Sequence, residues 1–235
     1  MLKKIRNNIP NAITCMNLAS GVMAVILAFR ATDDIALGLQ GYHWAMIMIG
    51  VAAIMDYLDG FAARLLQAVS PLGAELDSLS DLVSFGLAPA MILFNLMTGI
   101  LGDNSAMPFL SLLIPIAGAL RLARFNVDTN QTTTFTGLPI PANAIFWIGF
   151  CHYYADHSQA IPTWGVALFI ILLSYLMISN LRMFSLKMHS LNLRENYRQY
   201  LLIAGAVLCI TLGGISGFAW LIIYYVALSA IFKSK

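Results

Sequence analysis

Residues 56–81 read DYLDGFAARLLQAVSPLGAELDSLSD and place four aspartates, one arginine and two glycines inside an otherwise apolar chain. The spacing from Asp56 to Asp81 is D-x2-D-G-x2-A-R-x8-G-x3-D-x3-D. Charged side chains are costly at membrane depth, so they usually face a polar cavity and mark a functional site. This segment therefore predicts a polar functional site built into membrane helices.

The composition predicts a protein whose solvent is lipid. Of the 235 residues, 60% are hydrophobic and 10% are charged, against roughly 25% charged in ordinary soluble domains. The net charge of +2 is too small to suggest binding to nucleic acid, so no nucleic-acid partner is expected. The cysteines lie in separate apolar segments without C-x-x-C spacing, which implies no disulfide framework.

Eight apolar stretches are candidates for spanning helices, each of which needs about 20 mostly apolar residues. We expect residues 1–235 to form a single all-α, polytopic membrane domain with a six-span core and a C-terminal hairpin. The seventh stretch is short, and its separation from the eighth depends on Gly213-Gly214. The expected spans lie near residues 11–29, 38–63, 74–100, 106–124, 138–156, 162–184, 198–212 and 215–232.

The basic residues predict the orientation in the membrane, because short cytoplasmic loops carry an excess of lysine and arginine. Eight alternating spans with a cytoplasmic N-terminus place twelve of the thirteen Lys and Arg residues on the cytoplasmic side, with Arg30 as the exception. The basic segment 182–198 is expected at the membrane surface. An N-terminal signal peptide is disfavoured, since further spans follow it. We expect an integral protein of the inner cell membrane with its site facing the cytoplasm.

The aspartates fall on matching stripes of two consecutive helices. Asp56 and Asp59 are three residues apart, and Asp77, Asp81 and Ser84 repeat the pattern at 0, 4 and 7 on the next span. The connection between the two helices is short and contains Ser-Pro, which predicts an antiparallel hairpin. The carboxylates then converge near the cytoplasmic ends of both helices.

Four carboxylates in a partly dehydrated cleft need a counter-charge. Divalent cations supply it, and an all-oxygen ligand set suits Mg²⁺ or Mn²⁺ rather than zinc. One alternative is that the aspartates form helix-holding ion pairs with arginines. Another is a metal-free proton relay in a cation-coupled transporter, whose sites typically lie near the bilayer midplane. The position near the helix ends favours an enzyme supplied with cytosolic substrates.

The spacing of residues 56–81 resembles the signature of the CDP-alcohol phosphatidyltransferase family, integral membrane enzymes that build phospholipid headgroups. The resemblance implies that Asp56 and Asp77 bridge two metal ions, that Asp59 completes one site and that Asp81 completes the other. It also implies that Asp81 is the candidate proton acceptor. The residues expected by the same resemblance to contact the nucleotide-lipid substrate, CDP-diacylglycerol, are Gly60, Arg64 and Ser70.

The two glycines of the motif have two interpretations. Gly60 and Gly73 remove side chains where a large substrate must approach the backbone closely. The alternative is close packing between helices, which small residues permit in membranes. Within this motif we favour substrate approach.

A second motif pair bears on the alcohol acceptor. LRLARFN at residues 120–126 and FTGLPIP at residues 135–141 resemble the phosphatidylserine synthase branch of the family, which implies L-serine as acceptor and CMP as the released product. Arg121 and Arg124 are three residues apart, so both can face one cleft and pair with a carboxylate or a lipid phosphate. Anchoring to anionic headgroups is the alternative role. The connecting loop 126–137 either closes over a polar acceptor or is a solvated connection.

Two further questions stay open at this point. Glycerol phosphate or inositol phosphate are alternative acceptors within the same family. The expected partners also include membrane lipids, and a homodimer is one alternative for the oligomeric state.

On the first span, a polar residue recurs every third position, and this stripe lines the nucleotide pocket or hydrogen-bonds to neighbouring helices. The stripe consists of Asn11, Thr14, Asn17 and Ser20.

Overall fold

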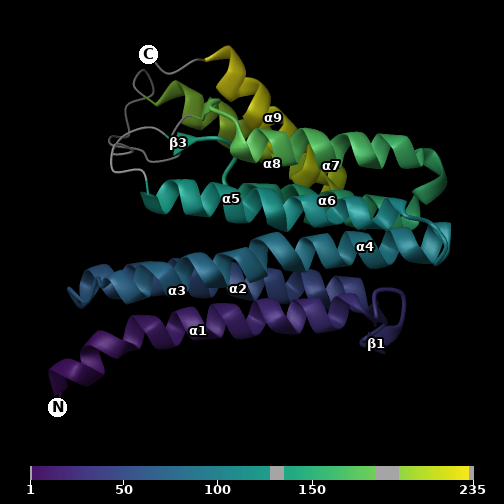
Figure 1. Ribbon diagram of the computed structural model, residues 1–235. Helices are drawn as coiled ribbons and strands as arrows, with labels where there is room; N and C mark the ends of the chain where they lie inside the picture. Colours follow the sequence, from purple (N-terminus) through teal and green to yellow (C-terminus); the bar gives the residue numbers. More distant parts are fainter. Residues whose placement is uncertain (1, 128–134, 184–195, 233–235) are drawn as a thin grey trace. The chain divides into compact units, whose positions relative to one another are not determined.

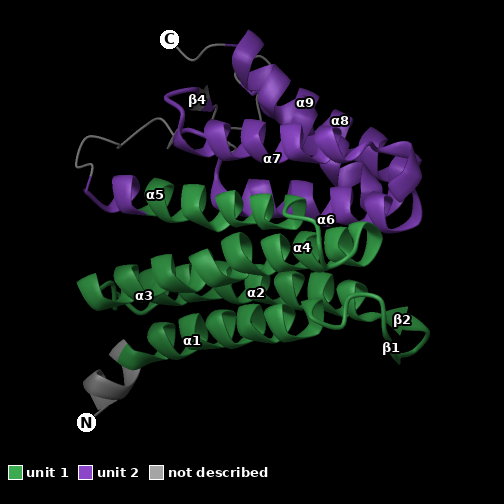
Figure 2. Cartoon of the chain, turned by 45° about the vertical axis from the view of Figure 1, so that its right-hand side comes forward, with its two compact units in different colours: residues 1–122 green, residues 123–235 purple. Residues whose placement is uncertain are grey.

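The computed structural model describes residues 2–127, 135–183 and 196–232 (Figure 1). These residues form helices with two short strand pairs, which confirms the all-α class. The chain divides into two compact units, residues 1–122 and 123–235 (Figure 2), which are described separately below. The helices are α1 (Leu2–Ala28), α2 (Gly41–Leu65), α3 (Pro71–Asp81), η1 (Leu82–Leu87), α4 (Ala88–Leu101), η2 (Met107–Leu112), α5 (Leu113–Val127), α6 (Ile140–Asp156), η3 (Ser158–Ala160), α7 (Thr163–Ile178), α8 (Tyr197–Gly213), η4 (Gly214–Ser216) and α9 (Gly217–Ile231).

The strands are confined to two connections. β1 (Asp34–Ala36) pairs with β2 (Leu39–Gln40) in the turn between α1 and α2, and β3 (Phe135–Thr136) pairs with β4 (Arg182–Met183). Both pairs are antiparallel.

Helix lengths support part of the expected span count. Five stretches of the described residues are long and apolar enough to cross a membrane. The expected spans near 138–156 and 162–184 form α6 and α7, which have only 17 and 16 residues. The count of eight therefore goes beyond what helix length shows. The five stretches are Asn8–Ala28, Gly41–Leu65, Pro71–Leu101, Met107–Val127 and Tyr197–Ile231.

In the first unit, α1 packs along α2 and also contacts α3, η1 and α4. Buried alanines on both α1 and α2, such as Ala24 and Ala52, permit close packing of the helices. Gly21 contacts η1 so closely that a Cβ atom there would lie 2.8 Å from the Cα atom of Ser84. This contact fixes the register of α1 against the helix that carries Asp77 and Asp81.

α3, η1 and α4 follow one another without a break and form a helical segment of 31 residues, in which η1 is π-helical. The π-helix η1 begins directly after Asp81 and contains six residues. Such wider turns are rare and often occur at functional sites, because they change the direction in which side chains point. Ser84 lies in η1, and its side chain is fully buried against α1.

The second unit contains the C-terminal hairpin that the sequence predicts. α8 and α9 pack against each other, and Tyr224 on α9 donates a hydrogen bond from Oη to the carbonyl of Leu201 on α8 at 3.2 Å. Gly214 lies at the turn with φ of +55°, a conformation that favours glycine. α9 also packs against α6, whose buried face includes Trp147 and Phe150.

Candidate active site

The carboxylates of the motif converge, as their spacing predicts. Asp56 and Asp59 lie on α2 and Asp77 lies on α3, and each offers a carboxylate oxygen such that all three oxygens lie within 4.8 Å of one another. The side chain of Asp56 also interacts with Asp81 at the end of α3. We call these four residues the acidic cluster.

The acidic cluster is partly buried, and the described residues place no salt bridge on it. Asp59 is only 5% exposed, and one carboxylate oxygen each of Asp59 and Asp77 is buried with no hydrogen-bond partner. Within residues 2–127, 135–183 and 196–232, no lysine or arginine forms a salt bridge with the cluster. Unpartnered, buried carboxylate oxygens that converge from two helices fit an oxygen-coordinated divalent cation such as Mg²⁺ or Mn²⁺. The helix-holding ion pairs considered above are not formed in the described part of the chain.

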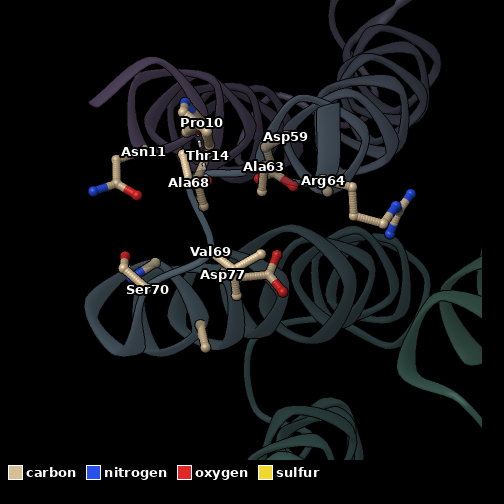
Figure 3. Close-up of a pocket in the computed structure, with 13 residues that line it drawn as sticks. Pro10, Asn11, Thr14, Asp59, Ala63, Arg64, Ala68, Val69, Ser70 and Asp77 are labelled. Carbon is tan, nitrogen blue, oxygen red and sulfur yellow. Dashed lines mark hydrogen bonds between the residues drawn. The ribbon is translucent and has the colours of Figure 1, made fainter. Parts of the chain in front are cut away.

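A cavity of about 210 Å³ adjoins the cluster inside the first unit. Figure 3 shows Asp59 and Asp77 at its centre, Arg64 to one side and Ser70 near the other end. Its walls come from α1, α2, α3 and the connection between α2 and α3. The lining residues are Pro10, Asn11, Thr14, Asp59, Gly60, Ala63, Arg64, Ala68, Val69, Ser70, Gly73, Ala74 and Asp77.

The two motif glycines differ in the space around them. A Cβ atom at Gly60 would lie 3.6 Å from Nη1 of Arg64, which is an ordinary contact, so the cavity beside Gly60 is open. A Cβ atom at Gly73 would lie 3.1 Å from both Oδ1 of Asn11 and Oγ of Ser70. The space beside Gly73 is therefore tight, whereas packing does not demand glycine at position 60; substrate approach at Gly73 stays a prediction.

Ser70 has a structural role in addition to its place in the cavity wall. It is the N-cap of α3, and its Oγ accepts a hydrogen bond from the backbone N–H of Gly73 at 3.1 Å. Pro71 follows at the first helical position, where its missing N–H costs nothing. The hydroxyl proton of Ser70 remains available for donation to a group in the cavity.

The two arginines of the second motif have different surroundings. Both lie on α5, but the boundary between the two units follows Leu122. Arg121 is half-buried in the first unit and is not part of the cavity wall. Arg124 is exposed, and its Nη1 donates a hydrogen bond to the carbonyl of Ile178 at 2.7 Å within the second unit. Neither arginine is among the residues that line the cavity.

Two segments that the sequence singled out are mostly outside the described residues. Residues 128–134 of the connecting loop 126–137 and residues 184–195 of the basic segment 182–198 belong to this group. Their expected roles at the acceptor site and the membrane surface stay predictions.

The polar stripe of α1 belongs to the site. Asn11 and Thr14 line the cavity, and Asn17 donates a hydrogen bond from Nδ2 to Oδ1 of Asp81 at 3.4 Å. The recurrence of polar residues every third position on an apolar helix was the sequence signal that this face of α1 is polar, but it did not identify the partner of Asn17. Ser20, the last member of the stripe, donates to its own helix at the carbonyl of Met16 instead.

Comparison with known proteins adds independent information. Residues 7–177 match the CDP-alcohol phosphatidyltransferase family. A protein of Bacillus subtilis named CDP-diacylglycerol–serine O-phosphatidyltransferase is 35% identical over 73% of this chain and 87% of its own length. A Methanocaldococcus jannaschii protein of the same name is 33% identical over 96% of this chain and 93% of its own length. The archaetidylserine synthase of Methanothermobacter thermautotrophicus is 32% identical over 72% of this chain and 70% of its own length.

Proposed function

Because the chain belongs to the CDP-alcohol phosphatidyltransferase family, we propose that it transfers a phosphatidyl group from CDP-diacylglycerol to L-serine and releases CMP. The observation that carries this proposal is the acidic cluster, whose oxygens converge beside a cavity and include two buried ones without a hydrogen-bond partner among the described residues. The names of the three relatives share serine and differ in the lipid. These names therefore support serine as the acceptor more strongly than they support a particular lipid.

The acidic cluster is proposed to hold two Mg²⁺ or Mn²⁺ ions. Asp56, Asp59, Asp77 and Asp81 would supply the carboxylate ligands. Bound divalent ions neutralise negative charge on the pyrophosphate and on the departing CMP. The buried oxygens of Asp59 and Asp77 support this assignment, since they have no hydrogen-bond partner in the described protein.

The cavity residues are proposed to bind the liponucleotide. The guanidinium of Arg64 pairs with the pyrophosphate, and the open space beside Gly60 admits the substrate close to α2. Ser70 donates its hydroxyl proton to the nucleotide while it caps α3. The cavity wall formed by Asn11 and Thr14 of α1 completes this pocket.

Asp81 is proposed to accept the proton of the serine hydroxyl. The oxygen then attacks the lipid-side phosphorus of the pyrophosphate, and a new phosphodiester bond forms. The bond from that phosphorus to the oxygen of CMP breaks, and CMP leaves with the electron pair. Its place in the acidic cluster, at the end of α3 and in contact with Asp56, supports this role.

Arg121 is proposed to recognise the carboxylate of serine. It lies three residues from Arg124, but Arg124 already donates to the carbonyl of Ile178. This contact supports a structural role for Arg124. A carboxylate paired with a guanidinium distinguishes serine from alcohols that lack the acid group.

The topology is proposed to contain eight spans with both termini in the cytoplasm. Four of the long stretches, α6, α7 and the two helices of the α8–α9 hairpin support this count. The cytoplasmic orientation of the acidic cluster follows from the distribution of basic residues. A homodimer remains a prediction, which light scattering of the purified protein would test.

The direct test of the reaction uses purified full-length protein in detergent with CDP-diacylglycerol, Mn²⁺ and isotope-labelled L-serine. We expect the label in phosphatidylserine, identified by mass spectrometry, and CMP in equal amount. Asp81→Asn should lose the product, whereas Glu75→Gln, an exposed acid on the same helix, should retain it. Label that stayed in free serine while the wild-type protein was folded would overturn the proposal.

A further inference from the structure

Asn17 on α1 is fully buried, and its side chain contacts two residues of the neighbouring helix. Its Nδ2 donates to Oδ1 of Asp81 at 3.4 Å, and its Oδ1 accepts from Oγ of Ser84 at 2.7 Å. The hydroxyl of Ser84 also lies 3.2 Å from the backbone carbonyl of Asn17. The amide is therefore held from both ends, between Asp81 and Ser84.

The chemistry of the three groups fixes which end of the amide faces Asp81. An ionised carboxylate only accepts hydrogen bonds, whereas a serine hydroxyl both donates and accepts. The NH₂ group of Asn17 must face Asp81, and its carbonyl oxygen then faces Ser84. Ser84 thus determines the orientation in which Asn17 meets Asp81.

The backbone holds Ser84 in place for this contact. Ser84 lies in the π-helix η1, and Gly21, one turn beyond Asn17 on α1, permits the close approach of the two helices. A side chain at Gly21 would collide with the backbone of Ser84. The close approach and the wide helical turn together bring Ser84 within reach of Asn17.

Given the proposed role of Asp81 as proton acceptor, we propose that Asn17 is a positioning residue for Asp81. Its amide holds Oδ1 of Asp81 against α1 and leaves Oδ2 for the acidic cluster and the serine hydroxyl. In this proposal Asn17 touches neither substrate nor metal. It orients Asp81, and Ser84 in turn orients Asn17. Residues that orient a ligating carboxylate in this way typically change metal affinity or activity by about ten- to a hundredfold when they are removed.

Ser80 provides a matched control for a purely structural role. It is also fully buried on α3, and its Oγ contacts the backbone carbonyl of Thr14 on α1 at 3.3 Å and that of Leu76 at 2.8 Å. Ser80→Ala removes a buried contact between the same two helices, but one that ends on backbone carbonyls rather than on a carboxylate. It should lower thermal stability and leave turnover and metal affinity at the wild-type level.

The experiment compares full-length Asn17→Ala, Asn17→Asp, Ser84→Ala and Ser80→Ala with the wild type. Thermal unfolding, Mn²⁺ affinity without substrates, and kcat and KM for both substrates are measured for each. We expect Asn17→Ala to lower kcat about ten- to a hundredfold and Mn²⁺ affinity about tenfold, with KM for CDP-diacylglycerol changed less than kcat. Asn17→Asp has the same shape but no donor, so it should not restore either quantity.

Ser84→Ala should change kcat in the same direction by a smaller factor, and should add little in the Asn17→Ala background, because both act through one chain of contacts. If Asn17→Ala fails to fold, Ser84→Ala tests the positioning role in its place. Wild-type kcat and Mn²⁺ affinity in Asn17→Ala, or in Ser84→Ala if only that variant folds, would overturn the positioning role. A wild-type protein that did not use serine would instead overturn the proposed function, while the Mn²⁺ comparison would still decide on Asn17.

Discussion

Asp59 on α2 and Asp77 on α3 direct carboxylates into one cavity, and each keeps a buried oxygen without a hydrogen-bond partner in the described protein (Figure 3). Buried polar atoms are almost always hydrogen-bonded, because leaving one unpaired costs about 1–3 kcal/mol or more when it is charged. Two such atoms at one place fit a site that binds a cation, which the described residues do not supply.

Removal of the metal should stop the reaction. Excess EDTA should abolish CMP release, and Mn²⁺ or Mg²⁺ should restore it. Asp56→Asn and Asp77→Asn should each lower activity more than about a hundredfold, since a ligand matters at least as much as the residues that orient it. Circular dichroism and thermal unfolding check that the variants fold, and Glu75→Gln is the matched control on α3. Full turnover in excess EDTA would contradict the metal assignment.

Arg64→Ala should weaken the use of CDP-diacylglycerol more than that of serine. Arg64 lines the cavity, and its loss would leave phosphate charge uncompensated. A charge-assisted contact of about 1.5–3 kcal/mol corresponds to about a ten- to hundredfold rise in apparent KM. Steady-state kinetics with each substrate varied in turn measures the effect, and Arg64→Lys should lie between wild type and Arg64→Ala. An unchanged KM for the liponucleotide would argue against this role.

Gly60→Ala should separate substrate approach from helix packing. The added Cβ atom meets only an ordinary contact with Arg64, and alanine favours a helix interior by about 0.5–1 kcal/mol over glycine. The variant should therefore unfold at the same or a higher temperature than wild type, yet have a higher KM for CDP-diacylglycerol. If it kept wild-type kinetics, the substrate would not approach α2 at this position.

Arg121→Ala should raise the KM for serine about ten- to a hundredfold and affect CDP-diacylglycerol less. Ethanolamine has the amine of serine but no carboxylate, so it should be a very poor acceptor for the wild type. Arg124→Ala should instead lower thermal stability, because its hydrogen bond to the carbonyl of Ile178 is lost. If Arg124→Ala raised the KM for serine and Arg121→Ala only lowered thermal stability, Arg124 would be the recognition residue and Arg121 the structural one.

Much of this site could be predicted from local spacing. Residues three or four apart lie on one side of a helix, so the sequence alone placed Asp56 with Asp59 and Asp77 with Asp81. The apolar stretches likewise predicted the order of the helices. The Ser-Pro pair predicted the connection between the two helices, and the structure adds that Ser70 of this pair is the N-cap of α3.

The remaining features depend on tertiary contacts that spacing cannot reveal. The π-helix η1 changes the direction of Ser84, and helical periodicity assumes a regular α-helix. The bond from Asn17 to Asp81 depends on how closely α1 approaches at Gly21. The different surroundings of Arg121 and Arg124 also had no sequence signal, because the carbonyl that Arg124 contacts lies far along the chain.

The identity of the acceptor is the central claim, and CMP release from CDP-diacylglycerol tests it most directly. Purified protein is incubated with Mn²⁺ and, in separate reactions, L-serine, ethanolamine, glycerol phosphate or inositol phosphate, and the initial rate of CMP release is measured. We predict that serine gives the highest rate and that ethanolamine stays near the rate without acceptor. Faster CMP release with glycerol phosphate or inositol phosphate than with serine would contradict the account.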